Sequence, residues 1–197
     1  MEPPPHRTSV RARKISPVAI WKRYVGIDAD LADQGAVAAA LCGGLLLGAL
    51  TTHADVLSAL ILGVLGADLC GGLVAHLRGP IARQVRRTGR SPAGHAAWVT
   101  GHLLQYACFA LILREAEPAR LAAVGAALLF GAITILRARP AIQRRVGLAA
   151  TCVGLIFIDA TVGLEETASW FLPLLLAKVF IAYLPEPLPS DATRLPG

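Results

Sequence analysis

The chain has 197 residues, of which 55% are hydrophobic and only 16% are charged, and its mean hydropathy is +0.58. This composition lies outside the usual range of soluble domains and indicates a membrane protein. The formal net charge of +6 is a property shared with nucleic-acid-binding proteins, but no polar segment is long enough to form such a domain, so we exclude nucleic acid as a partner.

Taken in chain order, the apolar segments that could cross a hydrocarbon layer of ~30 Å number about six. They cover residues 35–52, 56–77, 96–113, 121–136, 146–163 and 168–184. Proline, glycine and charged residues gather in the breaks between them, as expected where a chain leaves the bilayer. We therefore predict an all-α fold, a polytopic bundle of about six transmembrane helices.

The predicted transmembrane domain, residues 35–184, is flanked by two shorter parts. Residues 1–34 form a basic N-terminal segment, in which "ISPVAIWKRYVGI" combines aromatic and basic residues as a helix on the headgroup surface does. Residues 185–197 form a proline-rich polar tail that we expect to be disordered, as we do for "MEPPPHRTS" at the start of the chain.

The topology follows from the positions of lysine and arginine, which fall in three clusters. The clusters lie in the N-terminal segment, in the connection after the second span and in the connection after the fourth span: Arg7, Arg11, Arg13, Lys14, Lys22 and Arg23; Arg78, Arg83, Arg86, Arg87 and Arg90; Arg137, Arg139, Arg144 and Arg145. With six spans all three clusters lie on one side of the membrane. The positive-inside rule then predicts cytoplasmic termini in a bacterial inner membrane, with anionic lipid headgroups as partners of the basic loops.

Asp68 interrupts the second span, in "GADLCGGLVAHLRG". A helical projection places it beside a seam of small residues that allows another helix to approach closely, and places the leucines on the other side. The seam consists of Gly63, Ala67, Gly71 and Ala75, and the leucines are Leu62, Leu65, Leu69 and Leu73. We expect the aspartate to face protein at this seam rather than lipid.

Lys178 in the sixth span lies at nearly the same depth as Asp68, within ~5 Å. A buried ion pair would remove two isolated charges from the bilayer, and the alternative is that the lysine reaches the cytoplasmic surface. Polar residues of the second and third spans fall near the same level. The predicted buried polar cluster consists of Asp68, His76, His102, Gln105 and Lys178. It is either a functional site or a hydrogen-bonded network that only orients the helices.

A second group of polar residues is expected at the outer surface. It consists of His53, Asp55, Asp159, Glu165 and Glu166. Carboxylates and imidazole suit divalent metals, but charges at a membrane surface are commonly just solvated, so we assign no metal site and predict no cofactor. The four cysteines show no metal-binding spacing and are expected to be small buried residues.

Four segments, "ADLCGGLVA", "GHLLQ", "IQRRVGLA" and "LEETASWFLPLLLAKVFIAYL", resemble those of a group of small bacterial multi-spanning membrane proteins that has no assigned activity. The resemblance covers about a quarter of the chain. It implies an Asp-x-x-Gly-Gly pattern, matched by Asp68, Gly71 and Gly72, and a Trp-Phe-Leu-Pro pattern followed by lysine, matched by Trp170 to Pro173 and Lys178.

Three functions remain open. The first is a small permease or ion- or proton-coupled translocator that uses the buried cluster and, because the chain is short, needs a homo-oligomer. The second is a membrane-embedded enzyme or redox subunit, with His76 and His102 as haem ligands or with a metal in the outer group. The third is a non-catalytic membrane scaffold. The absence of GxSxG, HExxH and Walker motifs weighs against an enzyme.

Overall fold

The computed structural model describes residues 16–51, 55–77, 80–81, 91–163 and 169–185. These parts of the chain contain helices and turns and no strand, so the all-α prediction is confirmed. The α-helices are α1 (Pro17–Val25), α2 (Leu31–Leu50), α3 (Val56–Leu77), α5 (Pro92–Ile112), α6 (Pro118–Arg137), α7 (Gln143–Val162) and α8 (Phe171–Ala177). A 3₁₀ turn, η1 (Pro140–Ile142), precedes α7, and a π-helical segment, η3 (Lys178–Tyr183), continues α8.

Four of the described helices are long and apolar enough to cross a membrane: α2, α3, α6 and α7, the last taken together with η1. The chain is therefore a multi-spanning helical membrane protein by helix length and composition. The other two predicted spans are also helical, but they do not meet the same requirements of helix length and apolar composition. α5 has 21 residues but carries the polar residues of the third predicted span, and α8 with η3 forms a shorter apolar helix, Phe171–Tyr183.

Side-chain caps fix where several helices begin. Ser16, Asp30 and Ser91 each accept a hydrogen bond from the backbone N–H three residues ahead. Such caps satisfy N–H groups that the first turn of a helix leaves without partners. As a result α2 begins at Leu31, four residues before the predicted boundary at residue 35.

The sixth predicted span begins later than expected, because α8 starts at Phe171 instead of residue 168. Pro173 therefore stands in the first turn of the helix, where the missing proline N–H removes no intrahelical hydrogen bond. This span departs from α-helical geometry further along the chain, in the π-helical segment that begins at Lys178.

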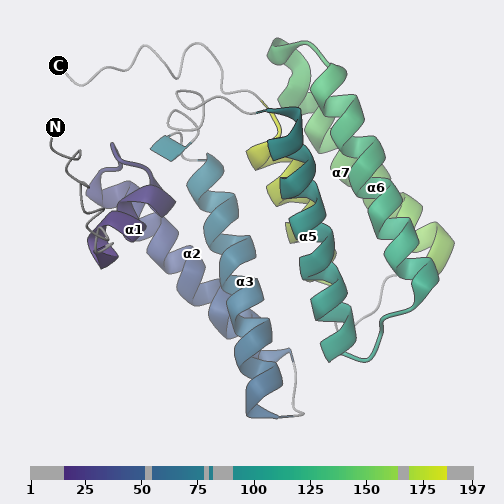
Figure 1. The fold of residues 1–197 in the computed structure, drawn as a ribbon, viewed down its shortest axis with the longest axis horizontal. Coiled ribbons are helices and arrows are strands. Elements are labelled where there is room, and N and C mark those ends of the chain that lie inside the picture. The colour runs from purple at the N-terminus through teal and green to yellow at the C-terminus, as the bar shows by residue number, and fades with distance from the viewer. Residues whose placement is uncertain (1–15, 52–54, 78–79, 82–90, 164–168, 186–197) are drawn as a thin grey trace, which may run out of the picture.

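Successive long helices run in alternating directions (Figure 1). The segment α1, the start of α5, the end of α6, the start of α7 and the end of η3 therefore lie at one end of the bundle. We call this the basic end, because the described residues there include Lys22, Arg23, Arg137, Arg139, Arg144 and Arg145. The opposite end holds the start of α3, the end of α5 and the start of α6.

Helices α2 and α3 form a tight antiparallel pair through glycine. A Cβ atom on Gly44 would overlap the backbone of Gly66, and one on Gly48 would overlap the backbone at Leu62. Two residues of the predicted seam on α3, Gly63 and Gly71, also face α2, and Gly63 lies against Leu45. The close approach expected of small residues is thus made between neighbouring helices.

The other side of α3 is packed as well, which the helical projection did not predict. Leu62 and Leu69 are fully buried, and they belong to one core with the aromatic and leucine side chains of α5, α8 and η3. Asp68 faces this second side, toward α5 and η3, instead of the seam filled by α2. Hence α3 is the central helix that joins the α2–α3 pair to the rest of the bundle.

Candidate functional site

Asp68 forms an ion pair with Lys178 near the middle of the bundle. Lys178 Nζ lies 2.5 Å from Asp68 Oδ2, and Gln105 Nε2 donates a hydrogen bond of 2.6 Å to the same oxygen. Three helical segments, α3, α5 and η3, are thus joined at one carboxylate oxygen. Charge-assisted hydrogen bonds of this kind are the strong ones, and burial strengthens them further.

The two partners differ in exposure. The Lys178 side chain is 2% exposed, whereas the Asp68 side chain is 36% exposed. Burying a charged lysine side chain to this extent is very costly unless an oppositely charged partner compensates its charge. The carboxylate is therefore the accessible member of the pair, and the ammonium group is the enclosed one.

Gly72 makes the room that the ion pair needs. It lies one helical turn after Asp68 and so on the same side of α3. A Cβ atom there would lie 2.6 Å from Lys178 Cε and 2.9 Å from Nζ, closer than any real contact. The neighbouring Gly71 clears space in a different direction, for Leu41 and the Tyr24 hydroxyl. The two glycines therefore serve separate contacts.

His102 lies one turn before Gln105 on α5 and within electrostatic range of the ion pair. It is 4% exposed, and its Nδ1 donates a hydrogen bond of 2.8 Å to the Trp98 carbonyl. A carbonyl only accepts, so in a neutral ring the proton is on Nδ1 and Nε2 is an acceptor. This Nε2 atom is buried and has no hydrogen-bond partner among the residues that the structure describes.

His76 lies closer to the basic end and takes part in an aromatic cluster. Its Nδ1 donates to the Gly72 carbonyl at 2.7 Å, and its ring contacts Trp98 and Tyr183, with centroids 5.5 and 5.6 Å away. The rings of Trp98 and Tyr183 stack on each other at 4.0 Å. Lys178 Nζ lies 5.8 Å from the Trp98 ring, so this cluster adjoins the ion pair.

Several buried polar atoms around the ion pair lack a hydrogen-bond partner among the described residues. Besides His102 Nε2 they are Trp98 Nε1, Gln105 Oε1 and the Tyr24 hydroxyl. Leaving such a group unsatisfied costs about 1–3 kcal/mol, so native proteins pair them with water or a ligand. The set contains both donors and acceptors, as a small polar molecule or a chain of waters requires.

The contacts of three aromatic residues near the ion pair, Tyr183, Tyr24 and Trp98, could not be predicted from α-helical spacing. Tyr183 follows Lys178 by five residues, and on an α-helix of 3.6 residues per turn such residues point in different directions. They serve the same region because η3 is π-helical. Tyr24 comes from α1, and burial, followed by the charge of Asp68, raises the pKa of its hydroxyl. Trp98 precedes His102 by four residues on α5, but helical spacing alone does not indicate that its ring stacks on Tyr183.

Only two members of the predicted outer polar group, Asp55 and Asp159, lie within the described residues. Asp55 is exposed and accepts hydrogen bonds of 2.8 and 2.7 Å from the backbone and hydroxyl of Ser58, so it caps α3. These hydrogen bonds lower the pKa of Asp55. Asp159 is exposed on α7. The remaining members, His53, Glu165 and Glu166, lie outside the described residues. In the part of the chain that is described, no three His, Cys, Asp or Glu residues gather as metal ligands would.

The expectation that all four cysteines are buried is wrong. Cys42 and Cys152 are exposed on α2 and α7, and Cys70 and Cys108 are partly buried. The reason is that small apolar residues are equally stable on a helix surface that faces lipid, so burial in protein is not required there.

Haem between His76 and His102 does not fit this arrangement. Trp98 contacts both imidazoles, with centroids 5.5 and 4.7 Å away, and is itself stacked on Tyr183. A flat macrocycle would have to displace this stack to bring both rings to one iron. A Soret band in the absorbance spectrum of the purified protein would contradict this conclusion.

The fold and the site together define a multi-spanning helical membrane protein with a partly buried, hydrogen-bonded ion pair near its middle. No protein-family model, curated protein or solved structure matches the chain.

Proposed function

We propose that this protein is a small ion- or proton-coupled permease of a bacterial inner membrane, and that the Asp68–Lys178 pair couples the movement of a proton to the movement of its cargo. The observation that carries the proposal is the enclosed lysine held by a partly exposed carboxylate at membrane depth. Ionisable groups inside a membrane are costly, and they are usually kept for ion or proton movement.

The proposed topology has six spans and cytoplasmic termini. The alternating direction of the helices and the six arginines and lysines of the basic end support it, because the positive-inside rule puts such clusters in the cytoplasm. The 21 residues of α5 give a helix of ~31 Å, long enough to span. The α8–η3 helix is shorter, and a local thinning of the bilayer would accommodate it.

Protonation of Asp68 would break the link between three helical segments. Once the carboxylate is neutral, Lys178 loses the charge that compensates it, and Gln105 loses an ionised acceptor. The enclosed ammonium must then release its proton or find another partner. Either response favours a different packing of η3 against α3, which is the kind of two-state element that coupled transport requires.

The polar atoms supply a route to the pair from one side only. Buried polar atoms of Trp98 and His102, for which the described residues supply no hydrogen-bond partner, lie between Asp68 and the basic end. Toward the opposite end, Phe109, Trp170 and Phe171 pack against one another. In the proposed topology this conformation therefore exchanges protons with the cytoplasm and is closed to the outside. A homodimer remains our expectation for the functional unit, since the chain is short.

The proton itself is the probe that tests this proposal, since the cargo is not yet identified. Purified protein in liposomes containing a pH-sensitive dye should dissipate an imposed pH gradient faster than protein-free liposomes, and Asp68→Asn should abolish the difference. The matched control is Asp55→Asn, because an asparagine oxygen can still cap α3 at that exposed position.

Two results would overturn the proposal. One is a wild-type flux no greater than that of empty liposomes. The other is an Asp68→Asn protein that folds and moves protons at the wild-type rate. Reporter fusions at each terminus and loop test the topology separately, and an external C-terminus would contradict it.

A further inference from the structure

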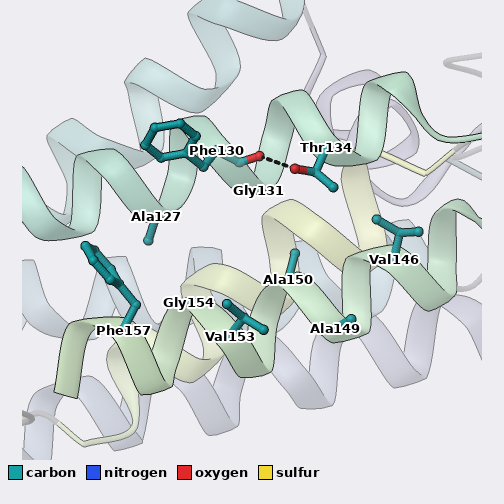
Figure 2. A pocket seen from close by; sticks show the side chains of 10 residues that line it. All are labelled: Ala127, Phe130, Gly131, Thr134, Val146, Ala149, Ala150, Val153, Gly154 and Phe157. Atoms are coloured by element: carbon teal, nitrogen blue, oxygen red, sulfur yellow. Dashed lines mark hydrogen bonds between the residues drawn. The ribbon is translucent and has the colours of Figure 1, made fainter. Parts of the chain in front are cut away.

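A groove lies between α6 and α7, away from the Asp68–Lys178 ion pair. Its volume is about 440 Å³, and its lining includes Ala127, Gly131, Val146, Ala150, Gly154 and Phe157 (Figure 2). The hydroxyl of Thr134, which also lines it, donates to the Phe130 carbonyl at 2.7 Å. The Thr134 hydroxyl therefore has a hydrogen-bond acceptor within its own helix, and the other side chains that line the groove are apolar.

Small residues on both helices produce the hollow. Ala127 and Gly131 are four apart on α6, and Ala150 and Gly154 are four apart on α7, so each pair lies on one face. Behind them α8 and η3 form the floor: a Cβ atom on Gly131 would lie 2.6 Å from Phe180 Cε2, and one on Gly154 would lie 3.2 Å from Leu176 Cδ1. The helices cannot move closer and fill the space themselves.

The groove has a closed end and an open end. The Phe157 ring points across it toward Ala127 and closes it on the side of the opposite end (Figure 2). From Phe157 to Val146 is eleven residues of α7, or ~16 Å at the rise of an α-helix. This length is about half of a ~30 Å hydrocarbon layer, so it corresponds to one leaflet.

The open end adjoins positive charge. Arg144 and Arg145 immediately precede Val146 on α7. Arg137 is the last residue of α6, and Arg139 lies in the short connection to η1. No acidic residue occurs between positions 137 and 146. Basic groups beside a crevice between transmembrane helices are a recognised binding arrangement for anionic lipid headgroups.

We propose that this groove binds one acyl chain of an anionic phospholipid, with the lipid phosphate on the arginines of the basic end. An acyl chain is thin enough to lie in a groove that Phe157 closes at one end, whereas a second transmembrane helix would have to continue past that ring. The groove does not include Asp68 or Lys178. A negative result for lipid binding would therefore leave the proposed transport untouched, and the reverse also holds.

The test uses the full chain in nanodiscs or detergent, with phosphatidylglycerol as the probe and phosphatidylcholine with the same chains as the comparison lipid. Native mass spectrometry should show one phosphatidylglycerol retained per protein. Ala150→Phe should reduce retention of both lipids to background by filling the groove, whereas Leu148→Phe, at a position 56% exposed on the same helix, should not. Replacing Arg139 and Arg145 by glutamine should weaken phosphatidylglycerol about fivefold for each arginine and leave phosphatidylcholine unchanged.

Other outcomes would decide against the site. Retention unchanged by a folded Ala150→Phe protein overturns it, as does equal retention of both lipids by the wild type. A wild-type dimer that Ala150→Phe dissociates would assign the groove to a second copy of the chain. If Ala150→Phe fails to fold, phosphatidylglycerol with a photoreactive group on its chain should crosslink the wild type at Ala149, Val153 or Phe157, and crosslinks confined to other helices would exclude the groove.

Discussion

The two halves of the bundle, one on each side of Asp68, are built differently. The half toward the basic end contains imidazole, indole and phenol groups and several buried polar atoms that have no partner in the described part of the chain. The half toward the opposite end is filled by aromatic rings, with Phe109 and Phe171 stacked at 3.9 Å and Trp170 edge-on to both. Polar groups are concentrated in one half, and packed apolar rings fill the other. The difference teaches that the ion pair stands at the boundary between a polar half and an apolar half.

The largest effect should come from breaking the ion pair at this boundary. Asp68→Leu leaves Lys178 enclosed without a counter-charge, and we expect a loss of about 3–5 kcal/mol in the free energy of unfolding. The measurement is reversible unfolding in detergent micelles. Lys178→Met should cost less, because the remaining carboxylate is 36% exposed and keeps its hydrogen bond from Gln105.

The double variant Asp68→Leu/Lys178→Met separates stability from function. Two apolar side chains of similar size should recover most of the stability, because no buried charge remains, while proton flux should stay absent. Asp159→Leu, on an exposed position of α7, is the control for adding a leucine. Equal stability losses for Asp68→Leu and Asp159→Leu would show that the ion pair does not hold the helices together.

The position of this boundary could largely be predicted from the sequence, because depth in a membrane follows from counting residues along apolar helices. Counting put Asp68 and Lys178 within ~5 Å in depth, and the structure has them in contact. Which side of α3 faces which helix could not be read in the same way. A seam of glycines predicts a close neighbour, but both α2 and η3 are close, and only the fold decides that Gly71 serves one and Gly72 the other.

The aromatic part of the site was harder to predict for a physical reason. Helical periodicity assumes 3.6 residues per turn, and η3 departs from it. Tyr183 therefore joins a cluster that its spacing from Lys178 does not indicate. Likewise the start of α8 at Phe171 has no side-chain cap, so no capping signal in the sequence indicates it.

An effect of comparable or somewhat smaller size is expected from opening the aromatic half. Phe109→Ala removes a ring that is 1% exposed, and deleting a buried phenylalanine side chain costs about 3 kcal/mol or more, depending on how far the cavity collapses. Beyond this loss, the variant should raise passive proton leakage through liposomes, because water gains access from the opposite end. Leu111→Ala on the same helix, at a position 66% exposed, should change neither quantity. A stable Phe109→Ala protein with wild-type leakage would mean that these rings are not the barrier.

The smallest effect concerns two tryptophans that make the same kind of hydrogen bond at the two ends of α2. Trp170 Nε1 donates to Thr51 Oγ1 at 3.0 Å and ties α8 to the end of α2. Trp21 Nε1 donates to Gln34 Oε1, also at 3.0 Å, and ties α1 to its start. Replacing either by phenylalanine keeps an aromatic ring and removes one hydrogen bond, so each should cost about 1 kcal/mol of stability.

The two substitutions should nevertheless differ in where the chain opens. Trp170→Phe releases a contact between segments 119 residues apart, so amide hydrogen exchange should accelerate in α8 and at the end of α2, and proton leakage should rise slightly. Trp21→Phe should accelerate exchange in α1 alone and leave leakage unchanged, because its contact lies at the basic end, away from the packed rings of Phe109 and Phe171. Equal leakage from the two variants would mean that the closed half owes nothing to the Trp170–Thr51 contact, and that the packed rings of Phe109 and Phe171 close it by themselves.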